Sequence, residues 1–144
     1  EITRPDILFL GQKDFQQCLI LTQLINSLKM PVELVMCPIY REPHGLAMSS
    51  RNVRLNPQIR QKAGAIYASL QYAAAMINIL TPQKIQQAAT AALNTIEGFN
   101  VDYFLLLNAD NLKPITPETH ANRMVIITAV IVDGVRLLDN MVIS

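Results

Sequence analysis

The first forty residues contain two short apolar runs separated by a helical stripe. Ile7 to Leu10 is one run, closed by Gly11, and Val32 to Met36 is the other; continuous apolar runs of this length are typical of buried strands in a parallel sheet. Between them, apolar side chains recur at helical spacing within residues 14–29: Phe15, Cys18, Leu19, Leu21, Leu24, Ile25 and Leu28. The pattern predicts a strand–helix–strand unit with a right-handed crossover.

The pattern changes after Pro38. Residues 41–56 are polar and predict a loop, and Asn56-Pro57 then begins a helix that reaches Ile77. Thr81-Pro82 begins a second helix in the same way; it runs through Ile96, and Gly98 ends it.

Three strands are expected after these helices. They cover Val101–Leu107, Met124–Val132 and Val135–Ile143, and the last two join at Asp133-Gly134, a strong hairpin signal. Asp139-Asn140 interrupts the last apolar run, which we interpret as a bulge or a hydrogen-bonded turn. The expected fold class is therefore α/β followed by α+β, with a domain over residues 1–40 and a small α+β domain over residues 41–144.

A single strand–helix–strand unit cannot make a stable sheet by itself. The chain also begins with Glu1 rather than methionine, and Ile7 follows almost at once. We therefore expect the chain to be the later part of a longer α/β protein.

Composition narrows the class of protein. The chain has 144 residues, 51% hydrophobic and 16% charged, and 12 basic against 11 acidic residues give a net charge of +1. Disorder is excluded, and no basic excess indicates nucleic-acid binding. No apolar run approaches the roughly 18 residues of a membrane span. With only Cys18 and Cys37, and with His44 far from His120, we expect no disulfide framework, no metal site and a cytoplasmic location.

The first candidate site is the segment from Gly11 to Gln17, where the first strand gives way to the helix. Ligands of open α/β sheets bind at the carboxyl ends of strands, and a helix N-terminus favours an anion. Gly11 would permit a tight turn, Lys13 would add positive charge, and Asp14 would cap the helix or accept a ribose hydroxyl. The alternative is an ordinary capped helix with a surface lysine.

The second candidate site is the polar loop from Arg41 to Asn52. Ser49 and Ser50 beside Arg51 can satisfy several phosphate oxygens at once. The alternative is a solvated connection with a serine N-cap. The two candidates support each other, because the crossover brings both strand ends to one side of the sheet.

These segments resemble the pantothenate synthetase (pantoate–β-alanine ligase) family. The family carries Gly-Glu-Lys-Asp, an aromatic residue and Gln-Gln, matched here by residues 11–17, and Arg-Glu-x-Asp-Gly-Leu-Ala-Met-Ser-Ser-Arg-Asn, matched by residues 41–52. Val101-Asp102-Tyr103 and residues 136–140 match further downstream. Gln12 stands where the family has glutamate, and His44 stands where it has aspartate.

The resemblance implies an ATP-dependent ligase that activates pantoate as pantoyl adenylate, releases pyrophosphate and then transfers the pantoyl group to β-alanine, releasing AMP. It implies the last strand–helix–strand unit of a Rossmann-like nucleotidyltransferase domain that binds ATP and pantoate, followed by a C-terminal lid domain. Mg²⁺ would accompany ATP, and the family is usually homodimeric.

The resemblance also implies roles for individual residues. Gly11, Gln12, Lys13 and Asp14 would contact ATP, Tyr40 and Met48 would line the adenosine pocket, and Ser49, Ser50 and Arg51 would hold the phosphates. Lys13 and Arg51 would be catalytic through the charge they neutralise, and Gln17 would bind pantoate.

The family's other half carries a His-x-Gly-His motif that is absent from this sequence. We therefore expect the chain to be a C-terminal fragment that is inactive alone and that self-associates. Two other functions stay open: a non-catalytic module that binds a partner chain, and a nucleotidyltransferase that adenylates a different acid.

Overall fold

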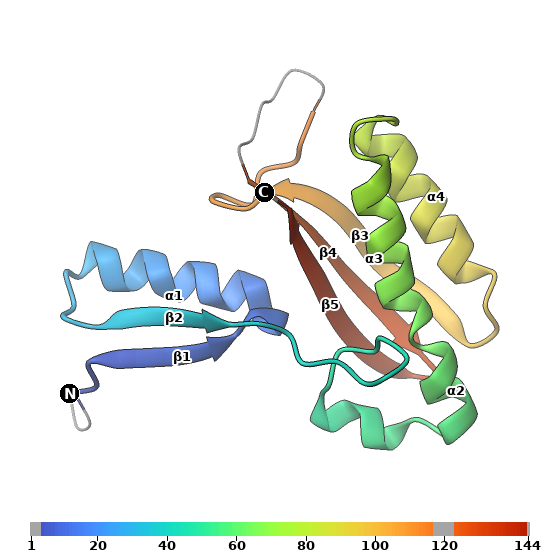
Figure 1. Cartoon of the computed structure of the whole chain (residues 1–144), viewed down its shortest axis with the longest axis horizontal. Helices are drawn as coiled ribbons and strands as arrows, with labels where there is room; N and C mark the ends of the chain where they lie inside the picture. The colour runs from blue at the N-terminus through green and yellow to red at the C-terminus, as the bar shows by residue number, and fades with distance from the viewer. Residues whose placement is uncertain (1–3, 117–122, 144) are drawn as a thin grey trace. The chain divides into compact units, whose positions relative to one another are not determined.

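The computed structural model describes residues 4–116 and 123–143 of the chain. These residues divide into two compact units, Glu1–Ile39 and Tyr40–Ser144 (Figure 1). We call them the first unit and the second unit. In the described residues, no helix is both long enough and apolar enough to cross a lipid bilayer.

The first unit is the expected strand–helix–strand. β1 (Ile7–Gly11) pairs in parallel with β2 (Glu33–Cys37), and α1 (Phe15–Ser27) connects them after the short 3₁₀ helix η1 (Gln12–Asp14). The helix buries the three side chains Phe15, Cys18 and Ile25. Gly11 lies opposite Cys37 in the ladder, so the carboxyl ends of both strands lie at the same edge.

The prediction that the first strand is buried is wrong for one of its faces. Ile7 is 45% exposed and Phe9 is 63% exposed, whereas the intervening Leu8 is partly covered. Successive side chains of a strand point to opposite faces, and one helix can cover only one face of two strands. The apolar composition of β1 therefore exceeds what the described part of the first unit can bury.

The second unit is built on an antiparallel sheet in the order β3-β4-β5. β3 covers Phe99–Asn108, β4 covers Met124–Val132 and β5 covers Val135–Ile143. Asp133 and Gly134 form the β4–β5 turn with φ of 49° and 77°, the left-handed backbone that a two-residue hairpin requires. The predicted hairpin is confirmed.

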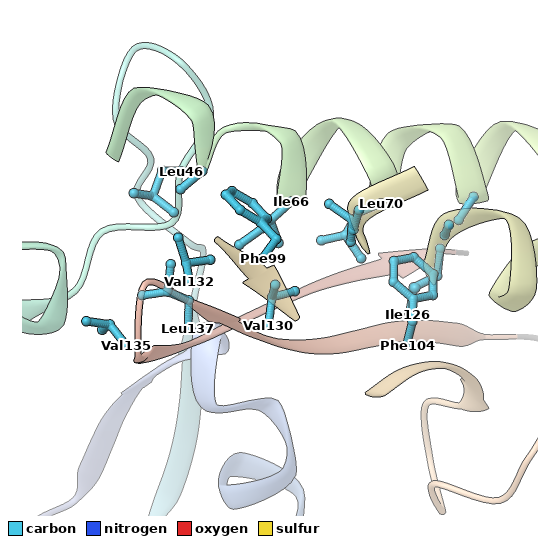
Figure 2. Close-up of a cluster of buried hydrophobic side chains, with 14 of the residues drawn as sticks. Leu46, Ile66, Leu70, Phe99, Phe104, Ile126, Val130, Val132, Val135 and Leu137 are labelled. Atoms are coloured by element: carbon cyan, nitrogen blue, oxygen red, sulfur yellow. The ribbon is translucent and has the colours of Figure 1, made fainter. Parts of the chain in front are cut away.

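Three helices accompany this sheet, and two of them cover it: α3 (Ala65–Met76) contacts β4 and β5, while α4 (Pro82–Asn94) packs on β3 (Figure 1). The buried side chains between the helices and the sheet form the core of the second unit (Figure 2), and they include Leu46, Ile66, Leu70, Phe99, Phe104, Ile126, Val130, Val132 and Leu137. The helix starts are those predicted: Asn56 caps α2 (Pro57–Lys62) and Thr81 caps α4, each followed by proline.

The helix expected from Pro57 to Ile77 is instead two helices, α2 and α3, divided at Ala63 and Gly64. The backbone is approached closely at this division: a Cβ at Gly64 would clash with the carbonyl oxygen of His44, so this position requires glycine. The loop before α2 thus passes directly over Gly64, and a hydrophobic pattern cannot reveal such a contact.

Replacing Gly64 with alanine is expected to destabilise the second unit by about 1–3 kcal/mol, because the inserted methyl group must displace a backbone carbonyl. Helix propensity alone predicts the opposite sign, a gain of up to about 1 kcal/mol. Urea unfolding followed by tyrosine fluorescence measures this, since all four tyrosines lie at or after position 40. Gln61→Ala, at an exposed position of α2, is the control; a Gly64→Ala chain as stable as wild type would contradict the prediction.

The bulge or turn expected at Asp139-Asn140 is not present. The β4–β5 register runs without a shift through Thr128↔Asp139 and Ile127↔Asn140, and the sheet's irregularity lies in β3 between Val101 and Tyr103. The Asp139 carboxylate is buried in this regular strand and has an ion-pair partner from another part of the chain, described below.

Candidate functional site

The first candidate segment lies at the carboxyl end of β1. Gly11 ends the strand with φ of −74° and ψ of 128°, an extended backbone that any residue adopts. The chain turns in η1, so the conformational freedom of glycine is not used at this position. A Cβ at Gly11 would meet nothing within 4 Å, so the backbone at this point is open to approach.

The side chains around this turn are differently placed. Asp14 occupies the N-cap of α1 without a side-chain capping bond, which leaves the proposed helix-capping role without support. Gln17 is exposed on the first turn of α1, and Lys13 is partly covered. Beneath them, the buried Cys18 thiol donates to the Gly11 carbonyl at 3.5 Å. Burial, followed by the nearby Asp14 carboxylate, raises the pKa of Cys18, which favours a packing role for this thiol.

The second candidate segment begins with a closed hairpin. The Met48 amide donates to the Tyr40 carbonyl at 2.9 Å, and the Glu42 amide donates to the Leu46 carbonyl at 2.8 Å. Gly45 forms the bend with φ of 99°, and a Cβ there would lie 3.0 Å from the ring of Tyr67. The bend therefore needs glycine for both its backbone angle and its space.

Arg41 fastens this hairpin to the sheet and to α3. Its two terminal nitrogens donate to the two carboxylate oxygens of Asp139 on β5, at 2.7 and 2.9 Å. One of them also donates to the Gly45 carbonyl at 3.0 Å, and the guanidinium carbon lies 3.7 Å from the centroid of the Tyr67 ring. Charge-assisted bidentate hydrogen bonds are stronger than hydrogen bonds between neutral groups, and the cation–π contact adds to them.

Glu42 fastens the other side of the loop. Its carboxylate accepts from Arg60 Nε at 2.9 and 3.1 Å and from Asn52 Nδ2 at 2.7 Å. The hydrogen bond from Arg60, then that from Asn52, lowers the pKa of Glu42 against the opposing effect of burial. Asn52 is buried and also donates to the Ala47 carbonyl at 3.1 Å. His44 Nε2 lies 3.7 Å from Glu42, beyond hydrogen-bond distance.

Between these two fastenings lies the segment Met48 to Arg51, which we call the presented segment. Met48 is 47% exposed, and Ser50 and Arg51 are also exposed at the start of the 3₁₀ helix η2 (Ser50–Arg54). Ser49 caps this helix by accepting from the Arg51 amide at 3.2 Å. Nearby in the chain, Tyr40 is 78% exposed. Hydroxyls, a guanidinium and two apolar surfaces suit a ligand that joins phosphates to an aromatic base.

The expected site residues thus fall into two sets. Gly11 to Asp14 and Gln17 belong to the first unit, and Tyr40 and the presented segment belong to the second unit. Within each unit, the residues of one set lie close together along the chain.

Sequence reasoning missed the residues that hold the loop. The second motif contains Arg41, Glu42 and Asn52. The motif alone does not show which of its residues bond to the rest of the protein and which are exposed to a ligand. Asp139 offered a usable signal, because a carboxylate in an otherwise apolar strand needs a cationic partner when it is buried. Tyr67 also belongs to this group, because its ring is the surface on which Arg41 stacks.

A cleft of about 500 Å³ is lined by Glu42, Pro43, His44, Leu55, Pro57, Arg60 and Gln61. None of the presented residues lines it. Among the residues that the structure describes, no three His, Cys, Asp or Glu side chains gather closely enough to hold a metal ion.

Comparison with known proteins identifies the family. The family model for pantoate-beta-alanine ligase matches residues 1–142. The chain belongs to the pantoate–β-alanine ligase family. The resemblance seen in the sequence is thereby confirmed.

Pantothenate synthetases from two bacteria illustrate the match. The enzyme of Cytophaga hutchinsonii is 39% identical over 144 residues, which cover 99% of this chain and 51% of that protein. The enzyme of Coprothermobacter proteolyticus is 38% identical over 146 residues, covering 99% and 50%. The chain thus spans about half the length of the ligase-family relatives it matches.

Solved structures of the family share the fold. Pantothenate synthetase from Thermus thermophilus superposes with a TM-score of 0.87 at 31% identity, covering 97% of this chain and 50% of that one. The ligase from Francisella tularensis, solved as a complex with β-γ ATP and β-alanine, superposes with a TM-score of 0.67 at 28% identity, covering 97% and 44%. The expected α/β then α+β fold class is confirmed.

Proposed function

We propose that this chain supplies part of an enzyme that condenses pantoate with β-alanine at the expense of ATP, through a pantoyl-adenylate intermediate. The observation that carries the proposal is the continuous family match over residues 1–142. The Francisella tularensis relative, complexed with β-γ ATP and β-alanine, supports ATP and β-alanine as substrates.

Two steps make up the proposed reaction. A pantoate carboxylate oxygen attacks the α-phosphorus of ATP, and pyrophosphate leaves. The β-alanine amine then attacks the pantoyl carbonyl carbon, losing a proton, and AMP leaves. In the first step negative charge accumulates on the departing pyrophosphate, and positioned cations stabilise such charge more than they stabilise bound ATP.

The residues divide these tasks between the two units. Arg51, beside the hydroxyls of Ser49 and Ser50, would hold phosphate oxygens, and Tyr40 and Met48 would offer apolar surface to the adenosine. In the first unit, Gly11, Gln12 and Asp14 would contact ATP, and Lys13 would supply the second catalytic charge. The exposure of Tyr40, Met48, Ser50 and Arg51 supports this assignment, since a ligand can reach them.

Mg²⁺ fits this proposal as an ion that arrives with ATP. Mg²⁺ is commonly held by one or two carboxylates together with substrate phosphates rather than by a cage of protein ligands. The nucleotide itself would therefore supply most of the ion's ligands. A homodimer of the whole enzyme and a cytoplasmic location belong to the same proposal.

Gln17 is proposed to bind pantoate. It lies three residues beyond Asp14 on the exposed first turn of α1, where an amide can reach a substrate near the strand end. Gln17→Ala is expected to raise the KM for pantoate by about tenfold, the cost of a hydrogen bond worth about 1.4 kcal/mol, while the KM for ATP changes less than about twofold. Steady-state kinetics with each substrate varied measures both constants. Gln16→Ala, at the exposed neighbouring position, is the control; a change in the ATP constant alone would contradict the assignment.

Reconstitution tests the proposed function as a whole. The chain is mixed with, or fused to, the half of the Cytophaga hutchinsonii enzyme that it does not match. We expect pyrophosphate release that requires pantoate, and pantothenate formation that also requires β-alanine. Release driven by another acid from a panel would favour the different nucleotidyltransferase. A tight complex without any ATP-dependent release would favour the partner-binding module.

A further inference from the structure

The Arg41–Asp139 ion pair joins residues 98 positions apart and is almost closed to solvent. The side chain of Asp139 is 3% exposed and that of Arg41 is 18% exposed. Asp139 lies in the middle of β5, opposite Thr128 of the central strand β4, where the register runs without a shift. A buried carboxylate with two charge-assisted hydrogen bonds is a fixed point to which a loop can be tied.

Arg41 connects the hairpin to Asp139. Its guanidinium is held by Asp139, by the Gly45 carbonyl and by the Tyr67 ring at once. Its backbone forms the bridge to Ala47, and the next amide along, that of Met48, bonds back to Tyr40. The direction in which the chain leaves the hairpin at Met48 is therefore set by where Arg41 is held.

The presented segment is fixed at its other end as well. Asn52 follows Arg51 directly, and its buried side chain is held by Glu42 and by the Ala47 carbonyl. Only four residues, Met48 to Arg51, lie between the two fixed points. A segment this short with both ends held has few conformations, so little ordering is required when a ligand binds.

We propose that Asp139 is a positioning residue for the nucleotide: by holding Arg41 it keeps Met48, Ser49, Ser50 and Arg51 in one arrangement before ATP arrives. The inference rests on the proposed function and deepens it. Asp139 touches no substrate in this scheme and acts only through Arg41. A loop that has to be ordered when ATP binds loses affinity for ATP, so loss of the Asp139 contact is expected to raise the KM for ATP.

The chain offers a matched control in the Asp102–Arg136 pair. That pair likewise involves β5, but it joins β5 to β3 rather than to the loop. Arg136 donates to Asp102 at 2.8 and 3.0 Å and lies over the ring of Tyr103 at 5.6 Å. The two side chains are 48% and 43% exposed, in contrast to the buried carboxylate of Asp139. Asp102→Asn therefore removes a similar ion pair from the same sheet at a position open to solvent.

Amide hydrogen exchange on the 144-residue chain tests the first link of the inference. In Asp139→Asn, the Met48 and Asn52 amides are expected to exchange about tenfold faster relative to amides of β4, because the loop opens locally. In Asp102→Asn the same ratio should change less than about twofold. Equal acceleration of loop and β4 amides would mean that Asp139 supports the whole unit rather than the loop, and would overturn the inference.

Kinetics of the reconstituted enzyme tests the second link. Asp139→Asn should raise the KM for ATP by about tenfold and leave the KM for pantoate within about twofold, whereas Asp102→Asn should leave both unchanged. If the Met48 and Asn52 amides exchange faster in Asp139→Asn but the KM for ATP is unchanged, the inference is also overturned. If Asp139→Asn fails to fold, Arg41→Lys keeps the charge, removes the bidentate contact and is expected to show the same pattern. If the wild-type chain and its complementary half together show no ligase activity, the proposed function is refuted instead. The exchange experiment would still report on the loop.

Discussion

Replacing Arg51 with alanine is expected to slow adenylation in the reconstituted enzyme by about 30- to 1,000-fold, equivalent to about 2–4 kcal/mol of transition-state stabilisation. The guanidinium is exposed at the start of η2, next to Ser50, and its own backbone amide is already fixed by Ser49. Its donors are therefore directed by the loop and remain accessible to a phosphate. Loss of this charge should lower kcat more than it raises the KM for ATP.

Arg54 provides the matched control for this substitution. It is an exposed arginine at the end of the same 3₁₀ helix, three residues away. Arg54→Ala should change pantoate-dependent pyrophosphate release less than about twofold. Lys13→Ala should resemble Arg51→Ala, with the exposed Lys29, at the other end of the α1 region, as its control. A loss below about threefold for Arg51→Ala or Lys13→Ala would exclude the role proposed for that residue.

The order and type of the elements could be predicted because hydrophobic periodicity and capping residues carry that information locally. Proline after Asn56 and Thr81 predicted both helix starts, and Asp133-Gly134 predicted the hairpin. These features depend on residues within one or two turns of each other. No contact between distant segments is needed to interpret them.

The features that differ from the predictions involve contacts between distant segments. The expected helix divides at Gly64, where the His44 carbonyl approaches the backbone, and Asp139, in a regular strand, pairs with Arg41. The exposed face of β1 reflects how few neighbouring elements the described first unit contains. A local stretch of sequence does not show which distant residue each of these positions will contact.

The candidate site shows the same division. The motif from Arg41 to Asn52 was found as one block, yet the structure divides it into residues that are tied down and residues that are presented. Arg41, Glu42 and Asn52 bond to the protein itself, whereas Met48, Ser50 and Arg51 are exposed. A motif that combines a ligand-binding segment with the residues that hold it can be specific to a family without every member touching the substrate.

The 144-residue chain by itself is expected to fold but to self-associate through the first unit. Its described surface there includes the exposed apolar side chains of Ile7, Phe9, Ile20, Leu24, Leu28 and Met30. They lie on or beside a two-stranded sheet and one helix, an arrangement that is rarely stable without further partners. Exposed apolar strands of this kind recruit other chains.

Sedimentation at several protein concentrations measures this association. Phe9→Lys should shift the chain toward monomer, because a charge on the open face of β1 opposes burial. Ile79→Lys is the control, since Ile79 is 69% exposed but belongs to the second unit. A wild-type chain that remains strictly monomeric, or an equal effect of both substitutions, would contradict the role given to the first unit.

The chain alone should also bind Mg·ATP weakly and form no pantothenate. It contains Lys13 and Arg51, but the resemblance to the family places further phosphate ligands in a His-x-Gly-His motif that this sequence lacks. Each missing charge-assisted contact weakens binding by about 1.5–3 kcal/mol, so the loss of two or more moves a micromolar site toward millimolar affinity. Calorimetric titration with Mg·ATP, before and after addition of the complementary half, measures the difference directly. A dissociation constant in the low micromolar range for the chain alone would mean that Lys13, the presented segment and their neighbours form a complete nucleotide site, and the complementary half would then be needed only for pantoate and for chemistry.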